Sequence, residues 1–306
     1  MAGKPLDSPP DGSDILLASF NLRKYFPIRG GLFSTHVGDV QAVDGISLTV
    51  RRGETVGLVG ESGCGKTTVG RLLLRLIEPT SGHAFYRPPA DIYARLEQLY
   101  ATLQPYAGAD NGSTKLPPDA KQALSELDKL AQQYSIFRKS HRQMSVLRSK
   151  FQIVFQDPFS SLGPRLLVRD IIAEPLECHH VGKASERNRR VLELLADVGL
   201  NPEHMWRFPH EFSGGQRQRI CIARALAGEV DVILADEPTA ALDTHTALEI
   251  MALLKELTRK AHKAAYVVTH DTRLERFATR VDHITDGVLT LGSASLEPQM
   301  NTDQHR

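Results

Sequence analysis

A glycine-rich segment at residues 60–68 places the strongest limit on how this chain can fold. It reads Gly60-Glu61-Ser62-Gly63-Cys64-Gly65-Lys66-Thr67-Thr68. A short apolar run at 55–59 precedes it, and apolar residues with helical spacing follow it as far as residue 77. A loop of this composition between a strand and a helix is typical of a P-loop, because its glycines let successive backbone N–H groups point at phosphate oxygens. We therefore expect residues 60–68 to cradle the phosphates of a nucleotide.

Three side chains of this segment have expected roles. Lys66 supplies a cation for the β- and γ-phosphates of ATP, and the Thr67 hydroxyl is a ligand for Mg²⁺. Cys64 has two interpretations. The helix N-terminus and Lys66 could favour its thiolate, in which case bound ATP slows its alkylation, or Cys64 could be an inert small residue in the loop.

Two adjacent carboxylates, Asp236 and Glu237, end a second apolar run that starts at residue 232. Paired carboxylates at the end of a buried strand are costly to bury, so a purely structural role is disfavoured. We expect Asp236 to hold Mg²⁺ through its water shell and Glu237 to be the base that polarises the attacking water. Together with the P-loop, this pair predicts hydrolysis of ATP.

A third segment precedes an expected helix that runs to residue 227. It reads Phe212-Ser213-Gly214-Gly215-Gln216-Arg217-Gln218. Its serine and glycine amides predict a second anion site at a helix N-terminus. The segment resembles the signature of the ATP-binding cassette (ABC) ATPases. In that family the signature addresses the γ-phosphate held by the other subunit, so the resemblance implies two ATP molecules between two cassettes.

The remaining marks of the family follow in the family's order. They imply that Gln156 senses Mg²⁺ and the attacking water, that Asp243 belongs to the D-loop, and that His270 contacts the γ-phosphate. The resemblance covers residues 15–291 without 87–150. It implies an α/β fold, which is a P-loop NTPase core with a mostly parallel sheet, an antiparallel β-subdomain and an α-helical signature subdomain.

Three further segments resemble the ATPases of oligopeptide and dipeptide importers, namely residues 24–33, 152–162 and 212–220. In that family an aromatic residue of the first segment stacks on adenine, which implies Phe26 first and Tyr25 second. Either ring could instead belong to the core of the β-subdomain. Members of this branch usually carry a C-terminal extension, whereas this chain ends soon after Leu291.

The chain has five expected parts. Residues 1–13 are polar and predict a disordered leader, residues 14–295 form the cassette, and residues 296–306 form a polar tail. Within the cassette, residues 157–227 are the helical subdomain and residues 87–150 are an insertion. Strands are expected at 40–43 and 46–50 with a hairpin turn at Asp44-Gly45, and a later hairpin is expected at Asp286-Gly287.

The insertion holds two expected amphipathic helices, 90–103 and 119–147, joined by a polar loop at 108–114. This pattern predicts a helical hairpin. Its apolar stripes could pack on each other, on the host domain or on another protein, and burial of apolar surface favours a self-packed insertion.

Composition narrows the class of partner. A net charge of +1 gives no basic footprint, so nucleic acid is not expected. The three cysteines form no Cys-x-x-Cys pair, which disfavours zinc, iron–sulfur and disulfide frameworks. The sequence holds no apolar run of about 18 residues, so any membrane role must come through partners.

The resemblance therefore implies an ATPase with ATP and Mg²⁺ as cofactors, peripheral at the cytoplasmic face of the cell membrane. It would power transport of peptides or a similar solute. The implied partners are a second ABC ATPase subunit, identical or a sister chain, transmembrane permease subunits and an extracytoplasmic solute-binding protein. Two alternatives stay open: the ATPase of a soluble, non-transport ABC complex, in an enzyme complex or on nucleic acid, and an inactive regulator, which the complete catalytic set disfavours.

Overall fold

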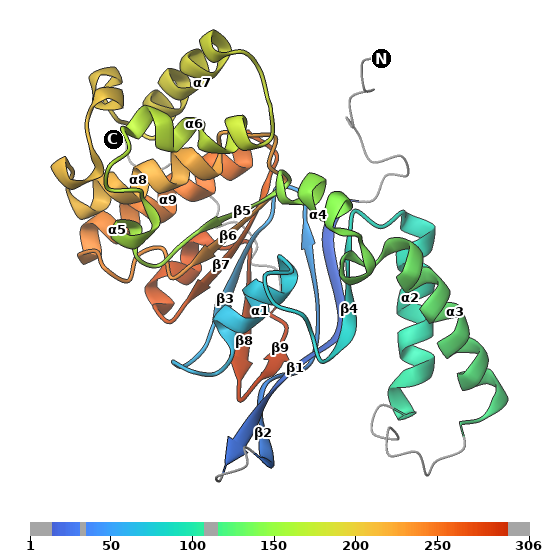
Figure 1. Cartoon of the computed structure of the whole chain (residues 1–306). Coiled ribbons are helices and arrows are strands. Elements are labelled where there is room, and N and C mark those ends of the chain that lie inside the picture. Colours follow the sequence, from blue (N-terminus) through green and yellow to red (C-terminus); the bar gives the residue numbers. More distant parts are fainter. Residues whose placement is uncertain (1–13, 31–34, 107–115, 293–306) are drawn as a thin grey trace, which may run out of the picture. The chain divides into compact units, whose positions relative to one another are not determined.

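The computed structural model describes residues 14–30, 35–106 and 116–292 (Figure 1). The expected leader 1–13, loop 108–114 and tail 296–306 lie outside these described residues. The chain folds as two compact units. Unit 1 consists of Met1–Arg52, Thr67–Phe151 and Asp286–Leu289, and unit 2 consists of Gly53–Lys66, Gln152–Thr285 and Thr290–Arg306. The insertion therefore belongs to unit 1, and the region 157–227 belongs to unit 2.

Unit 1 is built on a three-stranded antiparallel sheet with the order β2-β1-β4. The strands are β1 (Ile15–Gly30), β2 (Thr35–Arg51) and β4 (Ser81–Tyr86). The predicted hairpin at Asp44-Gly45 is wrong, because both residues lie inside β2. Leu22 pairs with Ile46 and Lys24 with Val43, so β2 has an extra residue there. With Gly45 at a φ of 73°, the dipeptide bends the strand as a bulge and does not reverse it.

The insertion begins with the expected helix, α2 (Ala90–Leu103), which continues as the short 3₁₀ turn η1 (Gln104–Tyr106). The second expected helix, 119–147, is split. It becomes α3 (Pro118–Tyr134), the 3₁₀ turn η2 (Ile136–Arg138) and α4 (His141–Arg148). Ser135 is extended and bridges to Phe85 of β4, which ends α3. Ser140 then starts α4 with a capping box, because its hydroxyl accepts from the Gln143 backbone N–H.

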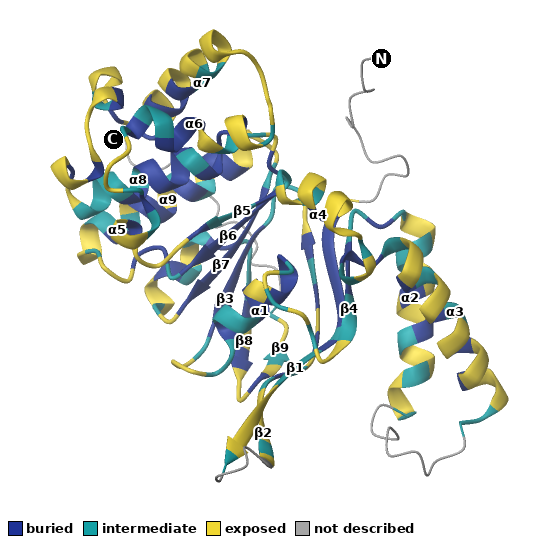
Figure 2. Ribbon diagram, in the orientation of Figure 1, coloured by how far each residue is buried: buried dark blue, intermediate teal, exposed yellow. Residues whose placement is uncertain are grey.

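The apolar stripes of α2 and α3 meet both each other and the sheet. One buried cluster joins residues of β1 and β4 to residues of the two helices: Ile15, Ala18, Phe20, Phe85, Leu96, Leu99, Ala123 and Leu127. Figure 2 shows the buried positions of α2 and α3 alternating with exposed ones, as in amphipathic helices. Packing on the host sheet thus accompanies the expected self-packing of the insertion.

The second sheet is mostly parallel and has the strand order β5-β6-β7-β3-β8-β9; its strands belong to unit 2 except for Phe151 and residues 288–289. The strands are β3 (Thr55–Val59), β5 (Phe151–Val154), β6 (Val232–Asp236), β7 (Ala264–Thr269), β8 (Arg280–Thr285) and β9 (Val288–Thr290). Every residue of β3, β6 and β7 is buried, as expected for parallel strands covered on both faces. The turn between β8 and β9 falls at Asp286 and Gly287, with φ of 49° and 77°, which confirms the second predicted hairpin.

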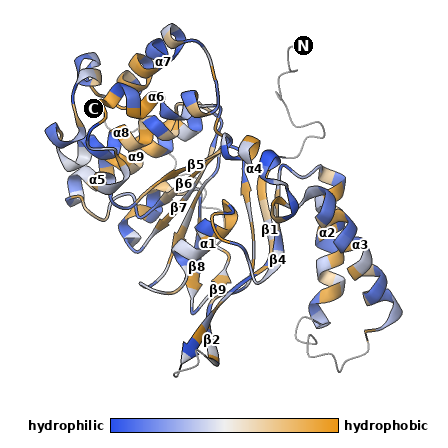
Figure 3. Ribbon diagram, viewed as in Figure 1, coloured by the Kyte–Doolittle hydropathy of each residue, from blue (hydrophilic) through white to orange (hydrophobic). Residues whose placement is uncertain are grey.

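Helices alternate with these strands along the chain. The first is α1 (Lys66–Leu73) after β3, and the later ones are α5 (Pro158–Ser161), α6 (Val168–Cys178), α7 (Ala184–Asp197), α8 (Gly214–Ala225) and α9 (Thr244–Lys260), with 3₁₀ turns η3 (Pro202–Trp206), η4 (Pro209–Glu211) and η5 (Thr272–Phe277). Figure 3 shows apolar residues gathered in α6, α8 and α9 and in the strands beside them, where one large buried cluster forms the core. In the described part of the chain, none of the helices combines the length and hydropathy needed to cross a bilayer.

Candidate active site

Three loops of unit 2 meet at one edge of the parallel sheet. Gly60 follows β3, Glu237 follows β6 and His270 follows β7. Val59 is paired with Thr269 and Asp236 with Val268, so the three strands end at nearly the same level. Ligands of open parallel sheets bind outside the carboxyl ends of the strands. The expected catalytic residues are therefore gathered where this type of fold places a site.

Glycine is required at specific positions of the P-loop. Gly63 and Gly65 have φ of 85° and 104°, which side chains rarely adopt. Gly60 has an ordinary φ, but a Cβ there would lie 2.3 Å from the Ile284 carbonyl oxygen. The glycine pattern that predicted the loop thus reflects both backbone conformation and close packing.

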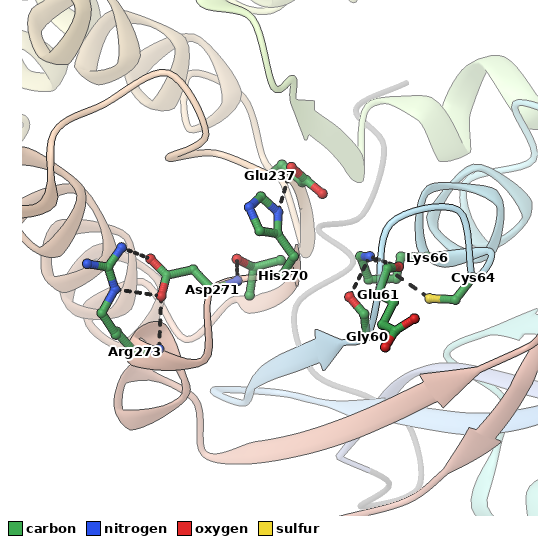
Figure 4. A network of polar contacts seen from close by, with 9 residues as sticks. Gly60, Glu61, Cys64, Lys66, Glu237, His270, Asp271 and Arg273 are labelled. Carbon is green, nitrogen blue, oxygen red and sulfur yellow. Dashed lines mark hydrogen bonds and ion pairs between the residues drawn. The ribbon is translucent and has the colours of Figure 1, made fainter.

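Lys66 is the first residue of α1, and its residue surface is only 4% exposed. Its Nζ donates to the carbonyl oxygens of Gly60 at 2.8 Å and Glu61 at 2.7 Å, as Figure 4 shows. The ammonium is thus enclosed by carbonyl oxygens of the loop. A phosphate oxygen is a stronger partner for this cation than a neutral carbonyl, so the same group is suited to a nucleotide phosphate. Ser62 is exposed, and Thr67 and Thr68 continue α1 half-buried.

Cys64 lies inside the loop, and its sulfur is 3.9 Å from the Lys66 ammonium. The residue is partly exposed, whereas Cys221 is buried and Cys178 is exposed at the end of α6. Burial raises the pKa of the Cys221 thiol. The protection of Cys64 from alkylation by ATP stays a prediction.

Glu237 and His270 form a pair across two strands. Glu237 Oε2 lies 3.1 Å from His270 Nδ1, and Figure 4 shows the two side chains pointing toward each other. Glu237 has a φ of 47°, an unfavourable conformation for a non-glycine residue. Its backbone N–H donates to the Val268 carbonyl at 2.8 Å, which holds this conformation in place. The side chain of Glu237 is 18% exposed and that of His270 58%, so the carboxylate is sheltered but reachable. Asp236, the last residue of β6, is buried.

Two residues that the sequence did not point to fix the loop after β7. Asp271 accepts from the Arg273 backbone N–H at 3.0 Å and forms an ion pair with its guanidinium at 2.7 Å. This guanidinium holds the pKa of the Asp271 carboxyl below its ordinary value. Arg273 also donates to the Thr244 hydroxyl at 3.0 Å, which ties the His270 loop to the start of α9. An Asp-x-Arg spacing is too common in sequences to have signalled this role.

The signature segment begins α8 with a capping box. Ser213 Oγ accepts from the Gln216 backbone N–H at 3.3 Å, and Gln216 Oε1 accepts from the Ser213 backbone N–H at 3.1 Å. Gly214 and Gly215 form the first turn, whose N–H groups suit an anion. A Cβ on Gly215 would lie 2.5 Å from a Thr246 methyl group, so this glycine permits close packing of α8 on α9.

Asp243 of the D-loop caps α9. Its carboxylate accepts from the Thr246 backbone N–H at 3.1 Å and from the Thr246 hydroxyl at 2.7 Å. These hydrogen bonds, that of the Thr246 hydroxyl first, lower the pKa of the Asp243 carboxyl. Because Thr246 also packs on Gly215, the D-loop and the signature segment are neighbours in unit 2.

Other predicted site residues are not brought together in this chain. Gln156, two residues after β5, is exposed and makes no hydrogen bond to Glu237 or His270 among the residues described. Within the same described set, the Ser213 hydroxyl bonds inside its own capping box and not to the P-loop. Among the described residues, no hydrogen bond therefore joins the Ser213 hydroxyl to the P-loop or to Glu237.

The aromatic candidates for adenine differ in exposure. Phe26, in unit 1, is 42% exposed, and the Lys24 ammonium lies 5.0 Å from the centre of its ring. The Tyr25 hydroxyl donates to Asp44 at 2.7 Å, and burial raises the pKa of this phenol. Phe26 is therefore not a core aromatic, and its stacking on adenine stays a prediction.

Comparisons with known proteins agree with this geometry. Residues 43–240 match the family model described as ABC transporter. The oligopeptide transport ATP-binding protein AppF of Bacillus subtilis (strain 168) is 42% identical over 91% of this chain and 70% of AppF. The glutathione import ATP-binding protein GsiA of Pectobacterium atrosepticum is 39% identical over 90% of this chain. The chain spans 37% of GsiA, and 42% of the peptidoglycan transport ATP-binding protein YejF of Agrobacterium fabrum, which is 38% identical.

Solved structures support the fold. The ATP-binding cassette MJ0796, solved as a dimer in a post-hydrolysis state with ADP and Pi, is similar with a TM-score of 0.64 and 27% identity over 89% of this chain and 95% of that one. This similarity confirms the predicted cassette fold, with its mostly parallel sheet, antiparallel sheet and helical region. The family model, the relatives, the P-loop and the carboxylates Asp236 and Glu237 lead to one conclusion: the chain belongs to the ABC transporter family and is an ATPase of that family.

Proposed function

We propose that this chain is the nucleotide-binding subunit of an importer for peptides or chemically similar solutes, and that it works as half of a cassette dimer. One observation carries the dimer. Lys66 and Glu237 lie at the same sheet edge, whereas Ser213 caps its own helix and makes no hydrogen bond to either of them among the described residues. A second cassette, in the simplest case another copy of this chain, completes each site with its signature. The names of AppF and GsiA support the solute class.

The residues at the sheet edge fit ATP with Mg²⁺. The P-loop offers backbone amides and the Lys66 ammonium to the anionic phosphates. The Thr67 hydroxyl and the Asp236 carboxylate supply oxygen donors, which Mg²⁺ prefers, and the Gln156 side-chain amide would add another from the turn after β5. When bound, Mg²⁺ would neutralise charge that develops on the phosphates.

The chain's own residues then have these roles. Lys66 exchanges the carbonyls of Gly60 and Glu61 for phosphate oxygens. Glu237 takes a proton from the attacking water, while His270 orients the Glu237 carboxylate and reaches the γ-phosphate. The amides of Gly214 and Gly215 from the second cassette stabilise the γ-phosphate on its opposite side. ATP thus closes the dimer, and hydrolysis reopens it.

The region after β5 is the proposed contact with permease subunits. Phe155 and Phe159 flank Gln156 and are 39% and 59% exposed. Asp157 caps α5 between them, with its carboxylate accepting from the Phe159 backbone N–H at 2.9 Å. Exposed aromatic side chains on an ordered turn are typical anchors of protein interfaces. A contact here would transmit changes at Gln156 to the membrane subunits, and a solute-binding protein would deliver the peptide from outside.

Affinity purification from detergent-solubilised membranes of the source organism tests this assignment. We expect multispanning proteins to copurify with the wild-type chain and with the control Val146→Asp, which changes a residue 61% exposed on α4. Phe159→Asp places a charge in the proposed contact, so it should lose these partners and keep ATP binding. A stable complex with soluble partners alone would refute the transport assignment, as would salt-sensitive stimulation of the ATPase by nucleic acid.

A further inference from the structure

A cleft of about 570 Å³ opens in unit 1 between the insertion and the antiparallel sheet. The sheet contributes Phe20 and His83 to its walls, α2 contributes Glu97 and Tyr100, and η1 contributes Tyr106. Its volume is within the range of small-molecule sites, roughly 300–1,000 Å³. None of the proposed nucleotide-binding or catalytic residues lines it. The insertion therefore builds a concave surface that the catalytic role does not use.

Two of the residues that line this cleft each carry a buried polar atom with no hydrogen-bond partner among the described residues. These atoms are the Tyr100 hydroxyl and His83 Nδ1. Their rings are held by neighbours: Phe20 stacks on Tyr100 with centroids 4.8 Å apart, and Phe85 lies 6.2 Å from His83. Buried polar groups are nearly always paired, because an unpaired one loses its hydration without compensation. A ligand in the cleft would supply both missing partners once small side-chain rotations open the two atoms to it.

The charged side chains of the cleft already have partners. Arg23 forms an ion pair with Asp44 at 3.1 Å, and Glu97 accepts from the Tyr93 hydroxyl at 2.7 Å.

The two unpaired groups, in contrast, are uncharged near neutral pH. Burial raises the pKa of Tyr100 and lowers that of His83, which the nearby Arg138 lowers further against an opposing effect of Asp128. The polarity left for a ligand is therefore that of a neutral hydroxyl and a neutral imidazole.

We propose that this cleft binds a small uncharged aromatic molecule that carries a hydrogen-bond acceptor beside a donor, as a carboxamide does. The Tyr100 hydroxyl donates to the ligand carbonyl, and His83 Nδ1 accepts from the ligand N–H. The rings of Phe20 and Tyr106 provide apolar surface for the aromatic part. A carboxylate or an ammonium in the same place would lose its hydration beside neutral partners, which disfavours charged analogues.

Benzamide, titrated into the full chain and followed by saturation-transfer NMR and calorimetry, tests the site. We expect saturable binding with a dissociation constant in the millimolar range, because the probe is small. Benzoate and benzylammonium should bind at least about fivefold more weakly. Tyr100→Phe removes one hydrogen bond and should weaken benzamide binding roughly threefold to tenfold. Tyr134→Phe is the matched control, since it also removes a tyrosine hydroxyl. Tyr134 packs against the same apolar cluster but does not line the cleft.

Two further readouts separate binding from folding. Tyr100→Phe keeps the ring and deletes an unpaired hydroxyl, so the melting temperature of the unligated protein should be unchanged or higher. Ala101→Trp starts from an exposed residue at the cleft and should block benzamide without unfolding the chain. The proposal is overturned by a titration that does not saturate, by equal affinity in the wild type and Tyr100→Phe, by undiminished binding to Ala101→Trp, or by equal binding of the charged probes. The measurement is independent of transport and of ATP turnover.

Discussion

Glu237 is held at both its backbone and its carboxylate. The backbone N–H is bound to the Val268 carbonyl, and the carboxylate meets the His270 ring at 3.1 Å. A base that takes a proton from water needs this kind of fixed direction, since proton transfer depends on hydrogen-bond geometry. The left-handed backbone conformation of Glu237 costs free energy, and the need to fix the direction of its carboxylate explains why the fold tolerates it.

Replacing Glu237 by Gln should therefore abolish turnover and preserve ATP binding. The amide keeps the shape of the side chain but cannot accept the proton, so we expect kcat to fall about 10²-fold to 10⁴-fold. Phosphate release and nucleotide binding would be measured on the same preparation. Glu256→Gln serves as the control, because it makes the same chemical change at an exposed position of α9. Glu256 pairs there with Lys260 and is not one of the proposed site residues. Normal turnover by Glu237→Gln would rule out the base assignment.

Site residues could be predicted from the sequence where one short segment contains the complete motif. The P-loop and the Asp236-Glu237 pair are of this kind, because their roles depend on one strand and the turn after it. The contact between Glu237 and His270 depends on the pairing of β6 with β7, which no local pattern contains. For the same reason Arg273, which bonds to Thr244 of another element, was not anticipated.

The end of α1 is fastened to the insertion. Arg75, two residues after this helix and with a φ of 49°, donates to the backbone carbonyls of Ile136 at 2.8 Å and Lys139 at 2.7 Å. It also pairs with Glu78 at 3.0 Å. The helix that starts in the P-loop is thus followed, two residues after its end, by a residue that holds η2 in place.

Arg75→Gln should loosen this attachment. The shorter neutral side chain cannot reach both carbonyls, so we expect a loss of roughly 1–3 kcal/mol in the free energy of local opening. Hydrogen exchange of the backbone amides around residues 136–139 measures this directly. Arg142→Gln, at an exposed position of α4, is the matched control. Unchanged exchange in Arg75→Gln would show that the insertion is held by its apolar cluster alone.

At the level of strands and helices, sequence patterns located the elements better than their ends. The expected helix 90–103 has its observed bounds, because its apolar stripe and polar flanks are local. The hairpin at Asp44-Gly45 and the single helix 119–147 were wrong. In both cases a long-range pairing decides: β2 stays extended beside β1, and Ser135 bridges to Phe85. Local propensity does not contain such pairings.

In the proposed dimer, the molecule as a whole carries two half-sites. Lys66 is buried in the P-loop, while Ser213 at the start of the signature helix is exposed and Gly214 is partly exposed. The family resemblance implied a dimer from the signature alone. The hydrogen bonds add a physical reason, since among the described residues none links Ser213 to Lys66 or Glu237 within this chain. Symmetric pairing of two copies would join each P-loop to the other chain's signature.

A mixing experiment with two inactive variants tests this account most directly. Lys66→Ala removes the phosphate cation and Ser213→Arg blocks the signature, so each variant alone should hydrolyse almost no ATP. A mixed dimer of the two retains one intact site, formed by the P-loop of Ser213→Arg and the signature of Lys66→Ala. With random pairing of equal amounts, we expect about a quarter of the wild-type ATPase activity to return. A mixture that stays inactive while the wild type turns over, or a Ser213→Arg variant that is active by itself, would contradict the shared site.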